Sequence, residues 1–150
     1  MMIPLLFAFG LTAATVLIHG LGTLEAIVQL GRVWQRKQGQ LGPFASALLM
    51  LSVVSVLLLL HWREAAVWAL FYLVSGTLPD LETAIYFSLT SYTTVGYGDV
   101  VLPAPWRLLG PFEGAVGILM FGWSTGIIVA AIARIYGSRL GLPSELGQGK

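Results

Sequence analysis

The chain has 150 residues, of which 57% are hydrophobic and only 10% are charged, and its mean hydropathy is +0.84. Soluble domains carry about 25% charged residues, so this composition excludes an ordinary soluble domain and indicates a small integral membrane protein. The formal net charge of +1 gives no reason to expect a nucleic-acid partner, and the lack of cysteine excludes disulfides, thiolate metal sites and cysteine nucleophiles.

The first apolar stretch covers residues 3–30, and a helix needs about 20 residues to cross a bilayer. A secretory signal peptide is the alternative, but the start Met1–Pro4 has no basic segment and no clear cleavage site follows the apolar run. We therefore expect residues 1–31 to form a transmembrane helix. His19 lies near its middle, beside small and polar residues at helical spacings, which predicts a face that contacts protein.

The second apolar stretch, residues 44–75, also predicts a transmembrane helix, but His61, Arg63 and Glu64 interrupt it. Ionisable groups at membrane depth are costly unless they are paired, and they often mark function. We expect Arg63 and Glu64 to neutralise each other or their neighbours, with His61 and His19 neutral and hydrogen-bonded at similar depths. The sharper alternative is proton-sensitive gating, because histidine titrates near about pH 6.5. A metal or catalytic pair of His61 and Glu64 has little support, because no third ligand is evident.

A shorter apolar piece, residues 81–92, leads directly into the run Thr93-Thr94-Val95-Gly96-Tyr97-Gly98-Asp99. At about 12 residues it is too short to cross a bilayer, so we expect a helix that enters the membrane halfway and returns through an irregular segment. Backbone carbonyls can replace the water of a potassium ion if consecutive residues turn their C=O groups toward one axis. Gly96 and Gly98 can adopt positive φ without steric cost, and the Thr94 hydroxyl can add one oxygen ring. A chance glycine-rich turn is the alternative.

The third apolar stretch, residues 111–136, predicts another transmembrane helix and is rich in glycine. Its glycines permit either bending or close helix packing, and packing is the better interpretation for most of them. Glu113 suits the start of a helix and can also add negative potential at an outer mouth. Ser124 and Thr125 either line an aqueous cavity or bond back to helix carbonyls, and we expect one of each.

From Ser46 to Ile135 the chain resembles the outer helix, pore helix, filter and inner helix of small bacterial potassium channels, most closely over residues 84–100. The resemblance implies a pore domain over residues 44–136, made of an outer helix 44–75, a pore helix 81–92, a filter 93–99 and an inner helix 111–136. It implies that the filter residues bind K⁺, namely Thr94, Val95, Gly96, Tyr97 and Gly98.

The resemblance also implies roles for the residues around the filter. Tyr86 and Phe87 would form part of an aromatic collar, with Thr93 leading into the filter. Thr90 stands where some family members carry a carboxylate behind the filter, so the slow inactivation linked to that acid is not carried over. Asp99 would accept a hydrogen bond from the Tyr86 hydroxyl, or else act as a solvated rim charge that attracts cations.

In the inner helix, Gly117 falls at the position of the family's gating hinge, and Phe121 at that of a cavity-lining aromatic residue. The chain departs from the family's minimal unit of two spans through its additional N-terminal helix. It also has no helix with arginine at every third position, so we expect no voltage sensor.

Loop 31–43 carries Arg32, Arg36 and Lys37 and no acid, whereas the segments on the other side carry an excess of acids. The positive-inside rule then places this loop and a flexible tail, residues 137–150, in the cytoplasm, with the N-terminus and the filter mouth outside. We expect the protein in the inner membrane of a cell.

A chain with one pore loop needs several copies around one axis to close a ring of carbonyls, so we expect a homotetramer in the lipid bilayer. The expectation is an all-α membrane protein with three transmembrane helices and a re-entrant pore helix and filter loop. It would conduct K⁺ passively, without enzymatic activity and without a cofactor other than the permeant ion. The alternatives are a cation channel of relaxed selectivity, a non-conducting regulatory subunit and an active potassium transporter.

Overall fold

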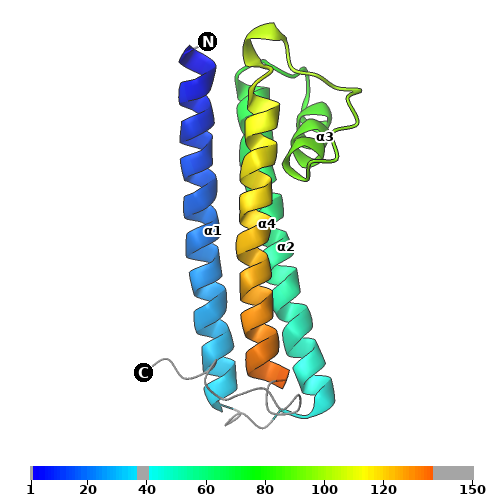
Figure 1. Cartoon of the computed structure of the whole chain (residues 1–150). Helices are drawn as coiled ribbons and strands as arrows, with labels where there is room; N and C mark the ends of the chain where they lie inside the picture. Colours follow the sequence, from blue (N-terminus) through cyan, green and yellow to red (C-terminus); the bar gives the residue numbers. More distant parts are fainter. Residues whose placement is uncertain (1, 37–40, 137–150) are drawn as a thin grey trace.

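The computed structural model describes residues 2–36 and 41–136, and this part of the chain is helical with no strand. Its elements are α1 (Met2–Arg36), α2 (Pro43–Val74), α3 (Leu81–Tyr92), the short 3₁₀-helix η1 (Ala104–Trp106) and α4 (Leu109–Tyr136). The long helices α1, α2 and α4 run side by side, and the short α3 packs beside them at the end that holds the N-terminus (Figure 1). The predicted all-α architecture is confirmed. The tail predicted at residues 137–150 lies outside the described residues.

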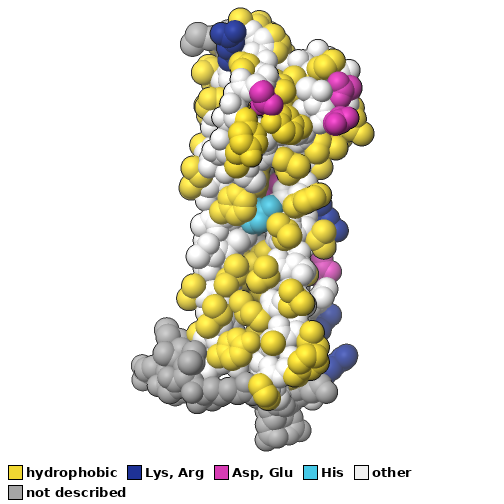
Figure 2. Space-filling view, turned by 90° about the vertical axis from the view of Figure 1, so that its right-hand side faces the viewer, with side chains coloured by type: hydrophobic (Ala, Val, Ile, Leu, Met, Phe, Trp, Pro, Cys, Tyr) yellow, Lys and Arg dark blue, Asp and Glu magenta, His cyan; other side chains and the backbone are white. Residues whose placement is uncertain are grey.

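The three long helices are each long and apolar enough to cross a membrane. Many of their large hydrophobic side chains are exposed, and Figure 2 shows such side chains along most of the length of one face. Because a bilayer offers no hydrogen bonds to backbone groups, helices with apolar outer surfaces are the form in which this chain can span it. At 32 residues, α2 is about 48 Å long. This exceeds the hydrocarbon thickness of about 30 Å, so the helix tilts or projects beyond it.

Two of the helix boundaries differ from the apolar stretches of the sequence. The first helix continues to Arg36, through residues that were expected to lie in a loop. Arginine and glutamine favour helix about as well as leucine does, so the apolar pattern marks the membrane-buried part of a helix rather than its end. The second helix begins at Pro43, which has no backbone N–H to leave unpaired at a helix start.

The short helix α3 occupies the residues predicted for the pore helix, and its start is set by a local hydrogen bond. The Asp80 carboxylate accepts from the Thr83 backbone N–H at 2.8 Å and from the Thr83 hydroxyl at 2.9 Å. This satisfies an N–H group that the first turn of the helix leaves unpaired. The same bonds lower the pKa of Asp80, because they favour its charged form.

The end of α3 is held close to α4 by a glycine. A Cβ atom on Gly117 would lie 1.9 Å from the Tyr92 carbonyl oxygen, so no larger residue fits there. This contact determines where the segment after α3 begins relative to the inner helix. It supports the interpretation of Gly117 as a packing residue, while a hinge at this position stays a prediction.

Candidate functional site

The filter segment begins where α3 ends and is tied back to that helix by two backbone hydrogen bonds. The Thr94 N–H donates to the Ser91 carbonyl at 2.9 Å, and the Gly96 N–H donates to the Thr90 carbonyl at 3.0 Å. Gly96 and Gly98 have φ angles of 50° and 82°, so the predicted positive φ of both glycines is confirmed. Thr94 also has a positive φ, 61°, which a side chain with a branched Cβ adopts only under constraint from its surroundings.

Side chains of α3 form hydrogen bonds and packing contacts around the filter segment. The Tyr86 hydroxyl donates a 2.7 Å hydrogen bond to Asp99 Oδ2, which is the bond expected between these two residues. It lowers the pKa of Asp99, and Asp99 is exposed, so the same carboxylate also lies at the rim as a negative charge. Phe87 is buried against the ring of Tyr72, with centroids 5.2 Å apart. The Thr90 hydroxyl bonds back to the Tyr86 and Phe87 carbonyls, both at 3.0 Å.

Glu113 is fully buried, so the prediction that it adds negative potential at the outer mouth is wrong. Its carboxyl lies against the pore helix, where the Tyr72 hydroxyl donates to Oε2 at 2.8 Å and Ser88 Oγ contacts Oε1. Ser88 Oγ also lies 2.6 Å from the Ala65 carbonyl oxygen. A carboxyl behind the pore helix is therefore present after all, but it comes from α4 and not from position 90.

The contacts of Ser88 determine the protonation state of Glu113. The Ala65 carbonyl can only accept, so it takes the single hydroxyl proton of Ser88. The contact between Ser88 and Glu113 then needs a proton from the carboxyl group. We therefore expect Glu113 to be a neutral carboxylic acid that donates to Ser88 and accepts from Tyr72, which also avoids an unpaired buried charge.

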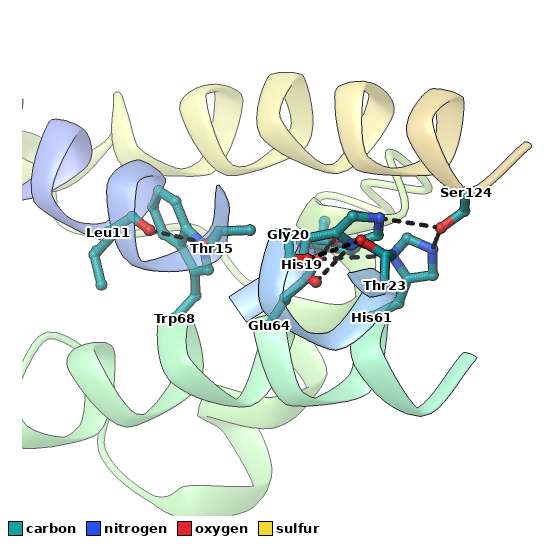
Figure 3. A network of polar contacts seen from close by, with 10 residues as sticks. Leu11, Thr15, His19, Gly20, Thr23, His61, Glu64, Trp68 and Ser124 are labelled. Atoms are coloured by element: carbon teal, nitrogen blue, oxygen red, sulfur yellow. Dashed lines mark hydrogen bonds and ion pairs between the residues drawn. The ribbon is translucent and has the colours of Figure 1, made fainter. Parts of the chain in front are cut away.

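A second polar cluster lies deeper in the bundle, around Glu64 (Figure 3). We expected Glu64 to be neutralised by Arg63 or by other neighbours. The pairing with Arg63 is wrong, because Arg63 is exposed and Glu64 is fully buried. Neighbouring residues of a helix point in directions about 100° apart, so they do not face each other. Glu64 Oε1 instead lies 2.8 Å from His19 Nδ1, and Glu64 Oε2 accepts from the Tyr92 hydroxyl.

The two histidines lie at the same depth, as expected, with ring centroids 5.3 Å apart. His19 supplies the third member that a group around His61 and Glu64 lacked in the sequence, and candidate ligand atoms of the three residues lie within 4.8 Å of one another. Hydrogen bonds within the cluster already engage these atoms. Ser124 Oγ lies near Nε2 of both rings, at 3.3 Å from His19 and 3.0 Å from His61.

The sequence pattern did not point to Tyr92, and it left the role of Ser124 open. Ser124 is buried among the histidines, so it neither lines a cavity nor bonds back to its own helix. Thr125 does bond back, to the Phe121 carbonyl at 2.8 Å. The Phe121 ring packs on His61, with centroids 4.3 Å apart, and is partly exposed. Its cavity-lining role stays a prediction.

A family model described as an ion channel matches residues 47–134, which is more than half of the chain. The matched part runs from α2 through α3 and the filter segment into α4, and α1 lies before it. Neither a curated protein nor a solved structure matched the chain.

Proposed function

Because the chain belongs to the ion channel family and is a multi-pass membrane protein, we propose that it conducts K⁺ selectively and passively through a ring of backbone carbonyls. The proposed ligands are the carbonyl oxygens of Thr94, Val95, Gly96 and Tyr97, with the Thr94 hydroxyl at the inner end. Gly98 completes the turn into the mouth.

One observation carries this proposal: φ is positive at every second residue of the filter segment, at positions 94, 96 and 98. In a strand of uniform φ and ψ, successive carbonyls alternate between two sides. Alternation of left-handed and right-handed residues turns successive peptide units the same way, as in the N–H concavities that bind anions. The N–H groups of Thr94 and Gly96 point to α3, so the carbonyls of this segment are free to face away from α3 together.

The direction of α3 supports the same conclusion. A helix carries a partial negative charge at its carboxyl end, and α3 ends at Tyr92, directly before the filter. Such an end favours a cation at the inner entrance of the filter. The Asp99 carboxylate adds a negative charge at the other entrance.

We propose a homotetramer because one chain supplies one filter segment and a closed ring needs several. The filter side chains Val95 and Tyr97 are exposed in the single chain, at 51% and 73%. Beside them a cavity of about 600 Å³ opens between α3, the filter and α4, with a largely apolar lining that includes Val101 and Ile118. A second copy of this chain would cover both surfaces.

The proposed orientation places the N-terminus and the filter mouth outside and the loop between α1 and α2 in the cytoplasm. The N-terminus and α3 lie at one end of the bundle (Figure 1), together with Asp80, Glu82 and Asp99. Arg32 and Arg36 lie at the opposite end of α1. This distribution follows the positive-inside rule.

The test is flux through the purified protein in liposomes, with K⁺ or Na⁺ as the only permeant cation. We expect K⁺ flux in the wild type and its loss in Gly96→Ala, because alanine at a φ of 50° is strained by about 1–2 kcal/mol in each copy. Gly10→Ala is the matched control, since a Cβ at Gly10 meets nothing within 4 Å, and it should conduct normally.

Equal K⁺ and Na⁺ permeability, measured from reversal potentials, would replace the proposal by a cation channel of relaxed selectivity. No flux from a well-assembled wild-type protein would favour a non-conducting regulatory subunit. Chemical cross-linking and mass determination in detergent test the tetramer, and a monomer would contradict the carbonyl ring.

A further inference from the structure

A buried ring of five polar side chains connects α1, α2, α3 and α4 at the point where the filter begins. His19 comes from α1, His61 and Glu64 come from α2, and Ser124 comes from α4 (Figure 3). Tyr92 is the last residue of α3. All five side chains are buried, from 0% to 6% exposed. Tyr92 directly precedes Thr93, so the ring contacts the base of the filter segment.

Five contacts close this ring. Glu64 accepts from His19 Nδ1 at 2.8 Å and from the Tyr92 hydroxyl, whose oxygen lies 3.0 Å from His61 Nδ1. Ser124 Oγ closes the ring on the other side, at 3.0 Å from His61 Nε2 and 3.3 Å from His19 Nε2. Each residue therefore contacts two others, in the order Glu64, His19, Ser124, His61, Tyr92.

The ring needs one proton more than its members carry in their ordinary forms. Each of the five contacts requires one proton. Two neutral histidines, one tyrosine and one serine supply four, and an ionised glutamate supplies none. With four protons, one contact brings two lone pairs together, and the ring keeps a buried negative charge, which is costly. A fifth proton completes all five hydrogen bonds and makes the ring neutral.

We propose that this ring is a proton-binding site that holds one additional proton, shared along the contact between Glu64 and His19. The 2.8 Å separation of these groups is typical of a charge-assisted hydrogen bond between a cationic nitrogen and a carboxylate oxygen. The corresponding distance from His61 Nδ1 to Glu64 is 3.7 Å, so His19 is the better carrier. In this state His19 Nε2 carries a proton and donates to Ser124, which donates to His61. Tyr92 keeps its proton throughout.

Several other ionisable groups on these helices make their contacts outside the ring. On α1, Glu25 is exposed and accepts from Gln29, and on α2, Arg63 is exposed. On α3, Tyr86 binds Asp99 at the mouth.

On α4, Glu113 is engaged by Ser88 and Tyr72, and we expect it to be neutral. The rings of Trp123 and Phe121 cover the two histidines on the side of α4. The negative charge of Glu64 is therefore balanced by a proton held within the ring. Of the two histidines, His61 keeps a small exposed area, 6%, and a histidine is visible at mid-height in Figure 2.

Loss of this proton to water would break one specific contact of the ring, between Ser124 and His19. Ser124 has one hydroxyl proton and can then serve only one of the two histidines, so the longer contact to His19 is the one that opens. This separates α1 from α4 while Glu64 and Tyr92 stay bonded. If the chain conducts as proposed above, the open probability of the filter changes over the pH range in which this proton dissociates.

The test is ¹⁵N NMR of the histidine rings in the full-length protein in lipid nanodiscs, as a function of pH. We expect His19 Nε2 to be protonated at neutral pH and to lose a single proton at alkaline pH. In Ser124→Ala the ring keeps three contacts and its members supply three protons, so no additional proton is needed to complete them. The pH midpoint of proton loss should therefore fall by about one to two pH units, which is the free-energy equivalent of one hydrogen bond to a charged group. Ser52→Ala, which removes an exposed hydroxyl from α2, should leave the midpoint unchanged.

Three results would overturn the proposal. The first is a His19 Nε2 without a proton at neutral pH, and the second is an unchanged midpoint in Ser124→Ala. The third is bound zinc at one ion per chain, together with a change in the histidine ¹⁵N signals when a chelator removes the zinc. The ring would then hold a metal ion and not a proton. K⁺ flux at the same pH values should follow the wild-type midpoint and shift with it in Ser124→Ala. A lack of flux at every pH contradicts the proposed function, while the NMR result still decides the proton site.

Discussion

Replacement of Glu113 by glutamine tests whether a neutral carboxylic acid lies behind the pore helix. The glutamine amide has nearly the same shape as a carboxylic acid, and it offers the same acceptor and the same donor that this site uses. Its C=O can accept from the Tyr72 hydroxyl, and its NH₂ can donate to Ser88 Oγ, which in turn donates to the Ala65 carbonyl. We therefore expect Glu113→Gln to change the free energy of unfolding by less than about 1 kcal/mol.

Glu113→Ala provides the contrast. It leaves the fully buried Tyr72 hydroxyl without an acceptor, at a cost of about 1–3 kcal/mol. It also removes one buried CH₂ group, at about 0.8 kcal/mol. Ser88 keeps its bond to Ala65, so it adds no further cost. The expected destabilisation is about 2–4 kcal/mol.

Unfolding in mixed micelles with increasing mole fraction of sodium dodecyl sulfate, followed by tryptophan fluorescence, measures both variants against the wild type. The reasoning is refuted if Glu113→Gln is as destabilised as Glu113→Ala. That result would mean that Glu113 is an ionised carboxylate, which an amide cannot replace.

Further variants probe the contacts of the filter segment, of the polar ring and of Gly117. Tyr86→Phe and Asp99→Ala should each lower the K⁺/Na⁺ permeability ratio, and the double variant should be no worse than either, because each single change already removes the same hydrogen bond. Since that bond lowers the pKa of Asp99, its stabilising effect should persist above the ordinary titration range of aspartate and vanish as the pH falls through the lowered value; loss already at pH 6 would contradict this. Glu64→Gln should change the free energy of unfolding by less than about 1 kcal/mol, because its C=O accepts from Tyr92 and its NH₂ can donate to Nδ1 of the other His19 tautomer, which supplies the fifth proton of a neutral ring; a loss of about 3 kcal/mol would refute the proton count. Gly117→Ala should prevent tetramer assembly through its clash with a backbone carbonyl, whereas Gly126→Ala, which meets nothing within 4 Å, should assemble on a sizing column like the wild type.

Much of the architecture follows from local sequence. Long apolar stretches predicted the three membrane-length helices, because hydropathy over about 20 residues is a local property. The 12 residues of α3 were predicted at their observed limits, from a short apolar piece that leads directly into the glycine-containing run. The positive φ of Gly96 and Gly98 was likewise predictable, because only glycine adopts it freely.

The polar interior was decided by the tertiary structure. Glu64 was expected to be neutralised by Arg63 or by other neighbours, and the sequence did not identify its partner His19, which lies 45 positions away, or Ser124, which lies 105 positions from His19. Glu113 looked like a helix-start acid at the mouth, yet the packing of α4 against α3 buries it on Ser88. A buried polar group must find partners wherever the packed helices bring them, and the spacing of residues along one helix does not contain that information.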